Sequence, residues 1–483
     1  MISITPTRED NPPMTRTRTF VALATTAAVL VPAVPAFAAS YPPPGNPGKI
    51  VKPRGKAKTL RVCKDARKIR RKQCFKTIQA AVDAARPRDI IRVSPGTYRE
   101  SVLITTKNKS GIKLIGDPRK PRRVVLEQKG LRGSFKRFGT DNVRGQNAIQ
   151  INGADGVTVD GFAAFHYKAN GFFAVNVTGY TLTHLVAGYG GAYGVYAFNS
   201  KGGTMSSSEA FYNNDSGFYI GQTPPQSGRK LRSTIRKVKS WGNVLGFSGT
   251  NVKYTTITDS DWYNNGLGIV PNALTSEKYY PPSENVMTRN RIFWNNFNYF
   301  KGAPFKLRPS ATGDIPYPVG TGILLFGSRD SDVVNNQIYG NFLIGVGGVQ
   351  QIVMAGGSPK EKEASFLRGN TVTGNVFGNN GRNPNGRADL YYDGDGSGNC
   401  FSGNTAPGGA LATVPTDGST FAACPFSGAN AFSQAAQLHA LDWTVNAPNH
   451  DEFWVRKPQQ PIKGVKPLEI CTVRNGACAG QPR

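Results

Sequence analysis

The sequence is poor in acidic residues, in histidine and in long apolar segments. It contains 30 Asp and Glu residues against 59 Lys and Arg, so its formal net charge is +29. A surface of this sign attracts polyanions, and the attraction weakens as salt rises. The four histidines are not spaced as metal ligands, which argues against a zinc site. With 39% hydrophobic and 18% charged residues, the chain still suits a folded protein rather than a disordered one.

One apolar stretch lies near the start of the chain, and no later segment is long and apolar enough to be transmembrane. Residues 20–37 (FVALATTAAVLVPAVPAF) lead into a small-residue site that ends at Ala38. We interpret residues 1–38 as a secretory signal peptide, and its natural start could equally be Met14. A membrane anchor is the alternative, but prolines interrupt the run. The mature protein is therefore expected to be secreted or associated with the cell envelope.

The six cysteines form three pairs of near neighbours in the sequence. In an exported chain, such pairs are typical of disulfides that close short loops. The expected disulfides are Cys63–Cys74, Cys400–Cys424 and Cys471–Cys478. No pair has the spacing of a zinc motif, so no metal is predicted at the cysteines.

A basic segment precedes the first predicted helix. We assign it to residues 39–74, and the stretch 49–76 carries thirteen Lys or Arg residues and a single acid, Asp65. Basic runs are usually solvated surface, but this density exceeds what solubility needs. Residues 75–85 (FKTIQAAVDAA) then place apolar side chains at helical spacing and predict one short amphipathic helix.

Glycines that open short apolar runs recur at a nearly constant spacing through the middle of the chain. Most successive spacings are 22 or 23 residues, and two longer ones, of 29 and 54, contain loops. The glycines are Gly171, Gly194, Gly217, Gly246, Gly268, Gly322 and Gly345. Apolar residues alternate after each glycine as in a strand, and asparagines gather at polar corners that can hydrogen-bond from coil to coil.

Units of this length, with short strands and no helix, predict stacked β-coils rather than a helical solenoid. The expected fold class is all-β: a right-handed parallel β-helix over residues 75–403. The short helix at residues 75–85 is expected to cap one end of the stack, and residues 404–483 the other. Caps are needed because the last strands would otherwise expose unpaired edges.

The segments TIQAAVDAA (residues 77–85), DIIRV (89–93) and PGTY (95–98) resemble the opening of the pectin-lyase-like superfamily. The asparagine-rich coils resemble the right-handed β-helix repeat proteins of that superfamily, so the resemblance covers residues 75–403. It implies the fold and does not select an activity, because the superfamily includes pectate lyases, pectinesterases, polygalacturonases and mannuronan epimerases. The signature motifs of these enzymes are missing from the sequence.

Two aromatic columns are candidates for a glycan site. Five places before successive glycines stand His166, Tyr189, Tyr212, Trp241 and Tyr263. If this column faces outward, His166, Tyr189 and Tyr212 could transfer protons; the alternative is an internal aromatic stack. A second ladder of Phe173, Tyr196 and Tyr219 should face outward as a platform for sugar rings, unless the long insertions cover it.

Charged residues cluster in the same coils. Asp259 and Asp261 are candidate catalytic carboxylates together with Arg289, while Lys237, Lys239 and Arg291 could neutralise the carboxylate of a uronate. The alternative is that opposite charges pair across neighbouring coils on a solvated face. No cofactor is predicted, and Ca²⁺ is the ion that paired carboxylates would suit.

Two functions fit these features. The first is an enzyme acting on an acidic polysaccharide, as a lyase or epimerase before a hydrolase. The second is a non-catalytic cell-envelope or glycan-binding protein whose basic segment holds anionic wall polymers. Nucleic-acid binding rests on charge alone and is the least favoured. A monomer is expected.

Overall fold

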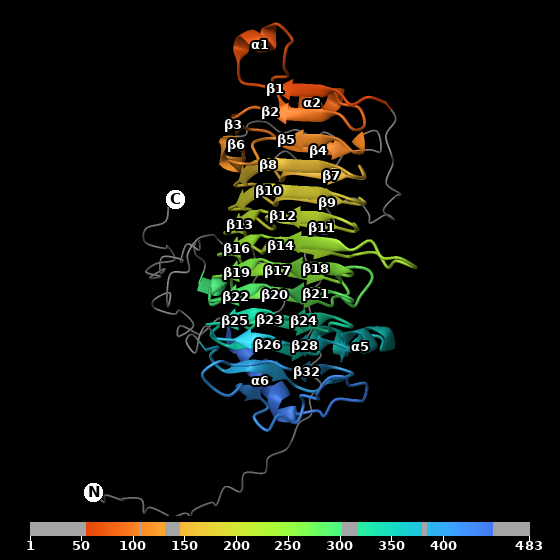
Figure 1. Ribbon diagram of the computed structural model, residues 1–483, viewed down its shortest axis with the longest axis vertical. Helices are drawn as coiled ribbons and strands as arrows, with labels where there is room; N and C mark the ends of the chain where they lie inside the picture. Colours follow the sequence, from red (N-terminus) through yellow and green to blue (C-terminus); the bar gives the residue numbers. More distant parts are fainter. Residues whose placement is uncertain (1–54, 106–108, 131–144, 302–316, 379–383, 448–483) are drawn as a thin grey trace, which may run out of the picture.

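The computed structural model describes residues 55–105, 109–130, 145–301, 317–378 and 384–447. The chain winds into one elongated stack of coils (Figure 1), and its strands pair in parallel from one coil to the next. Each complete coil crosses three strand ladders, of which one forms the smaller sheet and two lie side by side in the larger sheet. The predicted fold class, an all-β right-handed parallel β-helix, is confirmed.

The smaller sheet begins each repeat unit. Its strands are β4 (Val102–Thr105), β7 (Asn147–Asn152), β9 (Asn170–Val175), β11 (Val195–Phe198), β14 (Ser216–Gly221), β17 (Leu245–Thr250), β20 (Leu267–Asn272), β23 (Thr321–Phe326), β26 (Ile344–Val349), β30 (Ala388–Tyr392) and β33 (Thr413–Val414). The glycines of the repeat lie here because neighbouring coils approach closely: a Cβ on Gly194 would lie 2.6 Å from the carbonyl oxygen of Gly217.

The larger sheet has a first and a second ladder, and two of its strands bend to contribute to both. The bent strands are β8 (Thr158–Phe165) and β10 (Thr181–Gly188). The first ladder also contains β1 (Thr59–Val62), β2 (Ile90–Val93), β5 (Lys113–Ile115), β12 (Thr204–Ser206), β15 (Ser233–Arg236), β18 (Thr255–Thr258), β21 (Val286–Thr288), β24 (Asp332–Val334), β28 (Thr371–Thr373) and β32 (Cys400–Ser402).

The second ladder of the larger sheet runs beside the first. It contains β3 (Gly96–Tyr98), β6 (Val124–Glu127), β13 (Glu209–Phe211), β16 (Lys239–Trp241), β19 (Asp261–Tyr263), β22 (Arg291–Phe293), β25 (Gln337–Tyr339) and β29 (Val376–Phe377). A separate pair is formed by β27 (Leu367–Arg368) and β31 (Gly396–Ser397).

Helices are few and short among the described residues. They are α1 (Ala66–Arg70), α2 (Ile78–Ala84), the 3₁₀ turns η3 (Pro121–Arg123) and η4 (Tyr299–Lys301), α4 (Ile352–Ala355), α5 (Pro359–Ser365) and α6 (Gln434–Asn446). In the described part of the chain, no helix has the length and apolar character that crossing a membrane requires.

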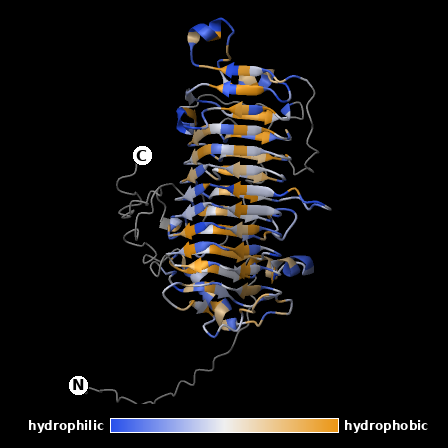
Figure 2. Cartoon of the chain, in the orientation of Figure 1, coloured by the Kyte–Doolittle hydropathy of each residue, from blue (hydrophilic) through white to orange (hydrophobic). Residues whose placement is uncertain are grey.

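The core is the inside of the coil stack. The apolar residues that directly follow the repeat glycines, such as Phe172, Val195 and Phe218, form an internal column and are at most 2% exposed. Aliphatic side chains of the larger sheet, such as Leu182 and Ile257, meet this column from the other side. Figure 2 shows the result as hydrophobic strands from one end of the stack to the other, with hydrophilic residues at α1 and in the loops.

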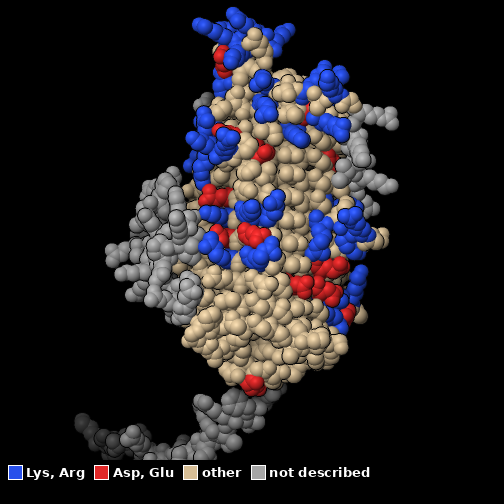
Figure 3. Space-filling view, in the orientation of Figure 1, with Lys and Arg blue, Asp and Glu red and all other residues tan. Residues whose placement is uncertain are grey.

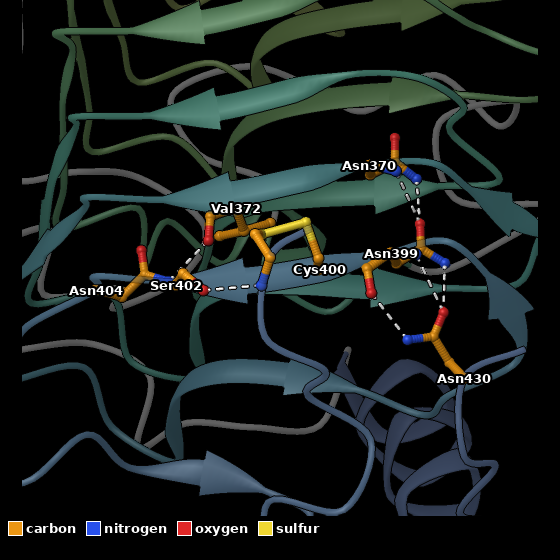
Figure 4. Close-up of a disulfide and its surroundings, with 8 residues drawn as sticks. Asn370, Val372, Asn399, Cys400, Ser402, Asn404 and Asn430 are labelled. Carbon is orange, nitrogen blue, oxygen red and sulfur yellow. Dashed lines mark hydrogen bonds between the residues drawn. A yellow bond between two sulfur atoms is a disulfide. The ribbon is translucent and has the colours of Figure 1, made fainter. Parts of the chain in front are cut away.

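Buried asparagines hold the corners of the coils together, as the polar corners of the sequence indicated. In one ladder each side-chain amide nitrogen donates to the amide oxygen of the next coil at 3.0 or 3.1 Å. Its members are Asn213, Asn243, Asn265, Asn295, Asn341 and Asn385. A similar ladder of Asn370, Asn399 and Asn430 lies at another corner (Figure 4).

Helix α2 covers the edge of the smaller sheet, which agrees with the capping role predicted for residues 75–85. The side chain of Gln79 accepts a hydrogen bond from the backbone N–H of Leu103 in β4 at 2.7 Å and donates one to its carbonyl oxygen at 3.1 Å. The amide group therefore takes the place of a neighbouring strand. The Glu100 carboxylate in turn accepts from the first backbone N–H groups of the helix.

Strand pairing extends beyond both boundaries expected from the sequence. At the start, β1 precedes residue 75 and pairs in register with β2, because residues 59–62 alternate outward and inward like the strands after them. At the end, β33 follows residue 403 and pairs with β30. Helix α6 packs on this end, where the Tyr391 hydroxyl donates to the carbonyl oxygen of Ala436 at 2.7 Å.

Two of the three expected disulfides are formed. Cys63–Cys74 closes the loop that carries α1, and Cys400–Cys424 ties β32 to the segment that follows the coils (Figure 4). Cys471, Cys478 and the predicted signal peptide lie outside the described residues.

The asparagine ladder gives a stability prediction. Asn295→Ala removes an amide that bonds Asn265, Asn341 and the carbonyl oxygen of Trp262. Because buried polar partners are left unpaired, the free energy of unfolding should fall by about 2 to 4 kcal/mol. Denaturant unfolding measures this loss. Asn446→Ala, on the surface of α6, is the matched control and should change stability by less than about 0.5 kcal/mol; equal losses would contradict the role of the ladder.

Candidate functional site

The outer face of the smaller sheet is closed. Phe173, Tyr196 and Tyr219 do point outward from their strands as predicted, but they are at most 3% exposed and form a buried cluster. Tyr193 covers them, with its ring centroid 4.6 Å from that of Tyr196 and 4.5 Å from that of Tyr219. The Tyr219 hydroxyl also donates to the Glu277 carboxylate, which comes from a long insertion. The three rings therefore form no open glycan platform, and the structure has the covered ladder that the sequence left as the alternative.

The column predicted five places before the glycines is not continuous in the structure. Its members were His166, Tyr189, Tyr212, Trp241 and Tyr263. The first three residues stack in successive coils, but Trp241 and Tyr263 pair in register with Phe211, one position earlier. The shift arises because Asn213 lies four residues before Gly217, whereas its stacked partner Asn243 lies three residues before Gly246. An alignment of the coils on their glycines is therefore wrong by one residue from this coil onward, for the positions that precede the asparagine.

His166 and Tyr189 lie at a partly exposed corner. The Nδ1 atom of His166 is 2.9 Å from a carboxylate oxygen of Glu127, and its ring stacks on Tyr189 at a centroid distance of 5.1 Å. Burial raises the pKa of Tyr189, and the nearby Arg122 guanidinium opposes this shift. Tyr212, the next member, is 4% exposed and packs edge-on against Trp241.

The charged candidates pair with one another along the stack. Arg289 bonds both carboxylate oxygens of Asp259 at 2.8 and 2.9 Å. Arg291 does the same with Asp261 at 2.7 and 2.8 Å. Hydrogen bonding to Arg289 lowers the pKa of Asp259. The structure thus has the paired arrangement that the sequence offered as the alternative to a catalytic carboxylate pair.

Lys237 and Lys239 border a groove one coil before these aspartates. The groove, here called the basic groove, has a volume of about 720 Å³ and lies between the η3 segment and the larger sheet. It is lined by Lys120, Pro121, Arg122, Arg123, Leu185, Val186, Ser207, Ser208, Glu209, Lys237 and Lys239. Five cations thus surround a single carboxylate. Figure 3 shows positive side chains gathered over the N-terminal part of this face and few charges over the C-terminal part.

Arg122 lies at the wall of the groove, where it contacts two aromatic rings and a carboxylate. Its guanidinium lies 5.7 Å from the ring centroid of Phe165 and 5.3 Å from that of Phe211. It also bonds the Glu209 carboxylate at 3.0 Å, and the indole N–H of Trp241 donates to the other Glu209 oxygen at 3.0 Å. These contacts fix both the cation and the carboxylate. The sequence shows a basic cluster at residues 118–123, but it does not show where this cluster packs, because η3 lies outside the repeat.

His184 is a further residue that sequence reasoning missed. It occupies the turn between the two halves of β10, directly before Leu185 of the groove lining. Its Nδ1 atom is 2.8 Å from a carboxylate oxygen of Asp160 in the preceding coil. Ser207 and Lys237 occupy the equivalent turn in the next two coils. An alignment of the coils by their strands would have placed His184 next to these residues.

Metal ligation has no support in the described part of the chain, where no group of three or more His, Cys, Asp or Glu could hold an ion. The Asp393-Gly394-Asp395 turn is internally bonded: a carboxylate oxygen of Asp393 accepts from the backbone N–H of Asp395 at 3.0 Å. Burial raises the pKa of Asp393 to about 7.

The described part of the basic segment forms a disulfide-closed loop at the N-terminal end of the stack (Figure 3). Its cations Arg67, Lys68, Arg70, Arg71 and Lys72 are exposed, while the carboxylate of Asp65 caps α1. The loop is a second positive surface, distinct in sequence from the basic groove.

No protein-family model matches the chain, and no curated protein matches it. Solved structures do. The A-module of mannuronan C-5 epimerase AlgE4 from Azotobacter vinelandii aligns at 16% identity over 70% of this chain and 91% of that chain, with a TM-score of 0.45. Pectate lyase Pel9A aligns at 14% identity over 74% and 78%, with a TM-score of 0.38. The catalytic domain of a GH87 α-1,3-glucanase in complex with nigerose aligns at 13% identity over 78% and 69%, with a TM-score of 0.44.

The fold that the sequence resemblance implied, a right-handed parallel β-helix, is the fold of this chain. The likeness concerns the β-helix fold, which the strand pairing of this chain shows independently. At these identities and scores it assigns no role to any residue.

The closed face generates a prediction about pH. Burial raises the pKa of the Glu277 carboxyl group from 4.5 to about 8, so the folded protein binds a proton that the unfolded chain has already released. Stability should therefore fall as pH rises from about 4.5 to about 8, by at most about 1.4 kcal/mol per pH unit from this group. Glu277→Gln should reduce that slope, measured by denaturant unfolding across this pH range.

Part of the decrease in stability with pH should remain in this variant, because the pKa of Asp393 is raised as well. Glu363→Gln, at a residue on the surface of α5, is the control and should leave the slope unchanged. An unaltered slope in Glu277→Gln would contradict a buried, protonated Glu277.

Proposed function

We propose that this β-helix is a carbohydrate-active protein that binds an acidic polysaccharide in the basic groove. The observation that carries the proposal is the grouping of five cations around one carboxylate on an open face of the stack. Polyanions are attracted to such a cleft, and the net charge of +29 adds a long-range contribution of the same sign.

The rigidity of the groove favours binding of an extended chain. Lys239 is the first residue of β16, and Lys237 lies in the turn two residues before it. Arg122 contacts Phe165, Phe211 and Glu209. Side chains that are already positioned lose little freedom on binding. Val186, which points outward from β10, supplies an apolar patch on the groove floor against which a sugar ring could pack.

The reaction that suits this site is elimination or epimerisation at a uronate. Cations beside the carboxylate stabilise the negative charge that develops when the neighbouring C–H proton is removed. Hydrolysis by two carboxylates has less support, because Asp259 and Asp261 are each engaged by an arginine. We place the protein outside the cell on the strength of the predicted signal peptide and its disulfides.

Binding is tested with a Lys237→Ala/Lys239→Ala double variant and oligomers of alginate, pectate and glycosaminoglycans. The Kd should rise by about 5- to 30-fold, equivalent to about 1 to 2 kcal/mol for two exposed charges, and the effect should shrink as salt increases. Calorimetry at two salt concentrations measures it. Lys278→Ala/Lys360→Ala removes the same charge at exposed lysines outside the groove and should have little effect. Equal weakening by both variants would refute a localised site.

The reaction is tested on the same polymers. A lyase should release unsaturated uronides, detected by ultraviolet absorbance, and an epimerase should incorporate deuterium from D₂O at the carbon next to the carboxylate without chain cleavage. Reducing-end assays cover hydrolysis. If binding is retained but all three assays remain silent on every polymer, the proposed reaction is wrong and the non-catalytic glycan-binding alternative replaces it.

A further inference from the structure

His184 occupies a turn that lies directly against the basic groove. Asp160 of the preceding coil pairs in register with Thr183, and Ser206 of the following coil pairs with Thr183 on the other side. His184 therefore stands opposite Ser207, a groove residue, and its neighbour Leu185 is part of the groove lining. The imidazole therefore lies beside the groove, one coil before Ser207 of its lining.

Asp160 fixes the imidazole in one orientation. The Nδ1 atom of His184 lies 2.8 Å from an Asp160 carboxylate oxygen, so in the neutral ring Nδ1 carries the hydrogen and donates it. The lone pair is then on Nε2. The two ring nitrogens point in divergent directions, so Nε2 faces away from Asp160. The side chain of His184 is 42% exposed, which leaves Nε2 accessible.

His184 adopts a φ of 47°, in the left-handed region. The same conformation recurs at this turn in the following coils, where Ser207 and Lys237 have φ values of 49° and 54°. The left-handed backbone is therefore a feature of the turn, and it sets the direction of the side chain without distinguishing the histidine from its neighbours.

The other titratable groups near the groove are engaged differently. Glu209 bonds both Arg122 and Trp241 and is a poor base while these contacts last. His166 is paired with Glu127 and its ring stacks on Tyr189, and its side chain is 27% exposed against 42% for His184. Lys237 follows Ser207 at the equivalent turn of the next coil, so a cation stands two coils from His184 across the groove floor.

We propose that His184, oriented by Asp160, is the proton-transfer residue for elimination on a polyuronate bound in the basic groove. The inference rests on the proposed function and adds the catalytic residue and the type of reaction. The substrate is a chain of uronates, with one carboxylate placed against Lys237 and Lys239. A single imidazole on one side of the groove suits elimination better than epimerisation, which needs a second proton donor on the opposite face of the sugar.

The step balances without a further reactant. Nε2 of neutral His184 removes the proton from the carbon next to the uronate carboxylate, and the electron pair of that C–H bond forms a carbon–carbon double bond. The bond from the adjacent carbon to the glycosidic oxygen breaks. The imidazolium, stabilised by Asp160, then gives the same proton to that oxygen, so one chain ends in an unsaturated uronide and the other in a hydroxyl group.

The experiment follows the histidine signals of the full chain by NMR. The chain has four histidines, so the imidazole resonances can be assigned from the His184→Gln and His439→Gln variants. Titration with saturated oligomers of alginate or pectate should shift the His184 signals and leave those of His439, on the surface of α6, unchanged. An oligomer that binds the wild-type groove without shifting His184 would overturn the inference.

Kinetics provide the second measurement. His184→Gln should bind the oligomer within about 2-fold of wild type and lose at least about 100-fold in the release of unsaturated uronides. Asp160→Asn, which keeps the size of the side chain, should lower kcat with little change in KM. His439→Gln is the matched control and should retain full turnover.

The possible failures are distinguishable. If no oligomer binds the wild-type protein, the proposed function fails and this inference fails with it. If binding is intact and depends on Lys237 and Lys239, but His184→Gln turns over within about 3-fold of wild type, only the role of His184 is refuted. Circular dichroism of each variant separates these outcomes from a loss of folding.

Discussion

The structure depends on hydrogen bonds that run from each coil to the next. Backbone ladders set a rise of about 4.8 Å per coil, and the corner asparagines repeat the same connection with their side chains. Asn295, for example, accepts from Asn265 and donates to Asn341 with no exposed surface. A slip of one residue would leave every amide of the ladder without its partner. The register of the whole stack is therefore tightly defined.

Because the register is fixed, residues at equivalent positions of successive coils lie directly above one another and form columns along the stack. Asp259 and Arg289 meet because they occupy the same turn in adjacent coils, and Asp261 and Arg291 meet on the adjoining strands. His184 also reaches Asp160 across one coil boundary, but diagonally, because its own register position is that of Gly161. The chemical surface of the molecule is thus set by which residue types stand one repeat apart, rather than by a local motif.

The repeat made the fold predictable, and its irregularities limited the prediction of the site. The glycine spacing follows from close contact between backbones, so it revealed the coils and the internal column that contains Phe172. The same count failed beyond Tyr212, where one residue fewer separates Asn243 from Gly246. The asparagine spacing and the glycine spacing can each be read from the sequence. Only the strand pairing shows that the outer column follows the asparagines and not the glycines.

The remaining errors come from contacts that span many residues. Glu277 covers Tyr219 across 58 residues, and Arg122 reaches Glu209 across 87. Insertions and η3 lie outside the repeat, so its period carries no information on where they pack. Their placement nevertheless decides which face is open. It closes the smaller sheet over its aromatic ladder and builds a wall beside the larger sheet, where Arg122 lines the same groove as Lys237 and Lys239. The basic groove therefore lies on the larger sheet, whose outward columns carry charge.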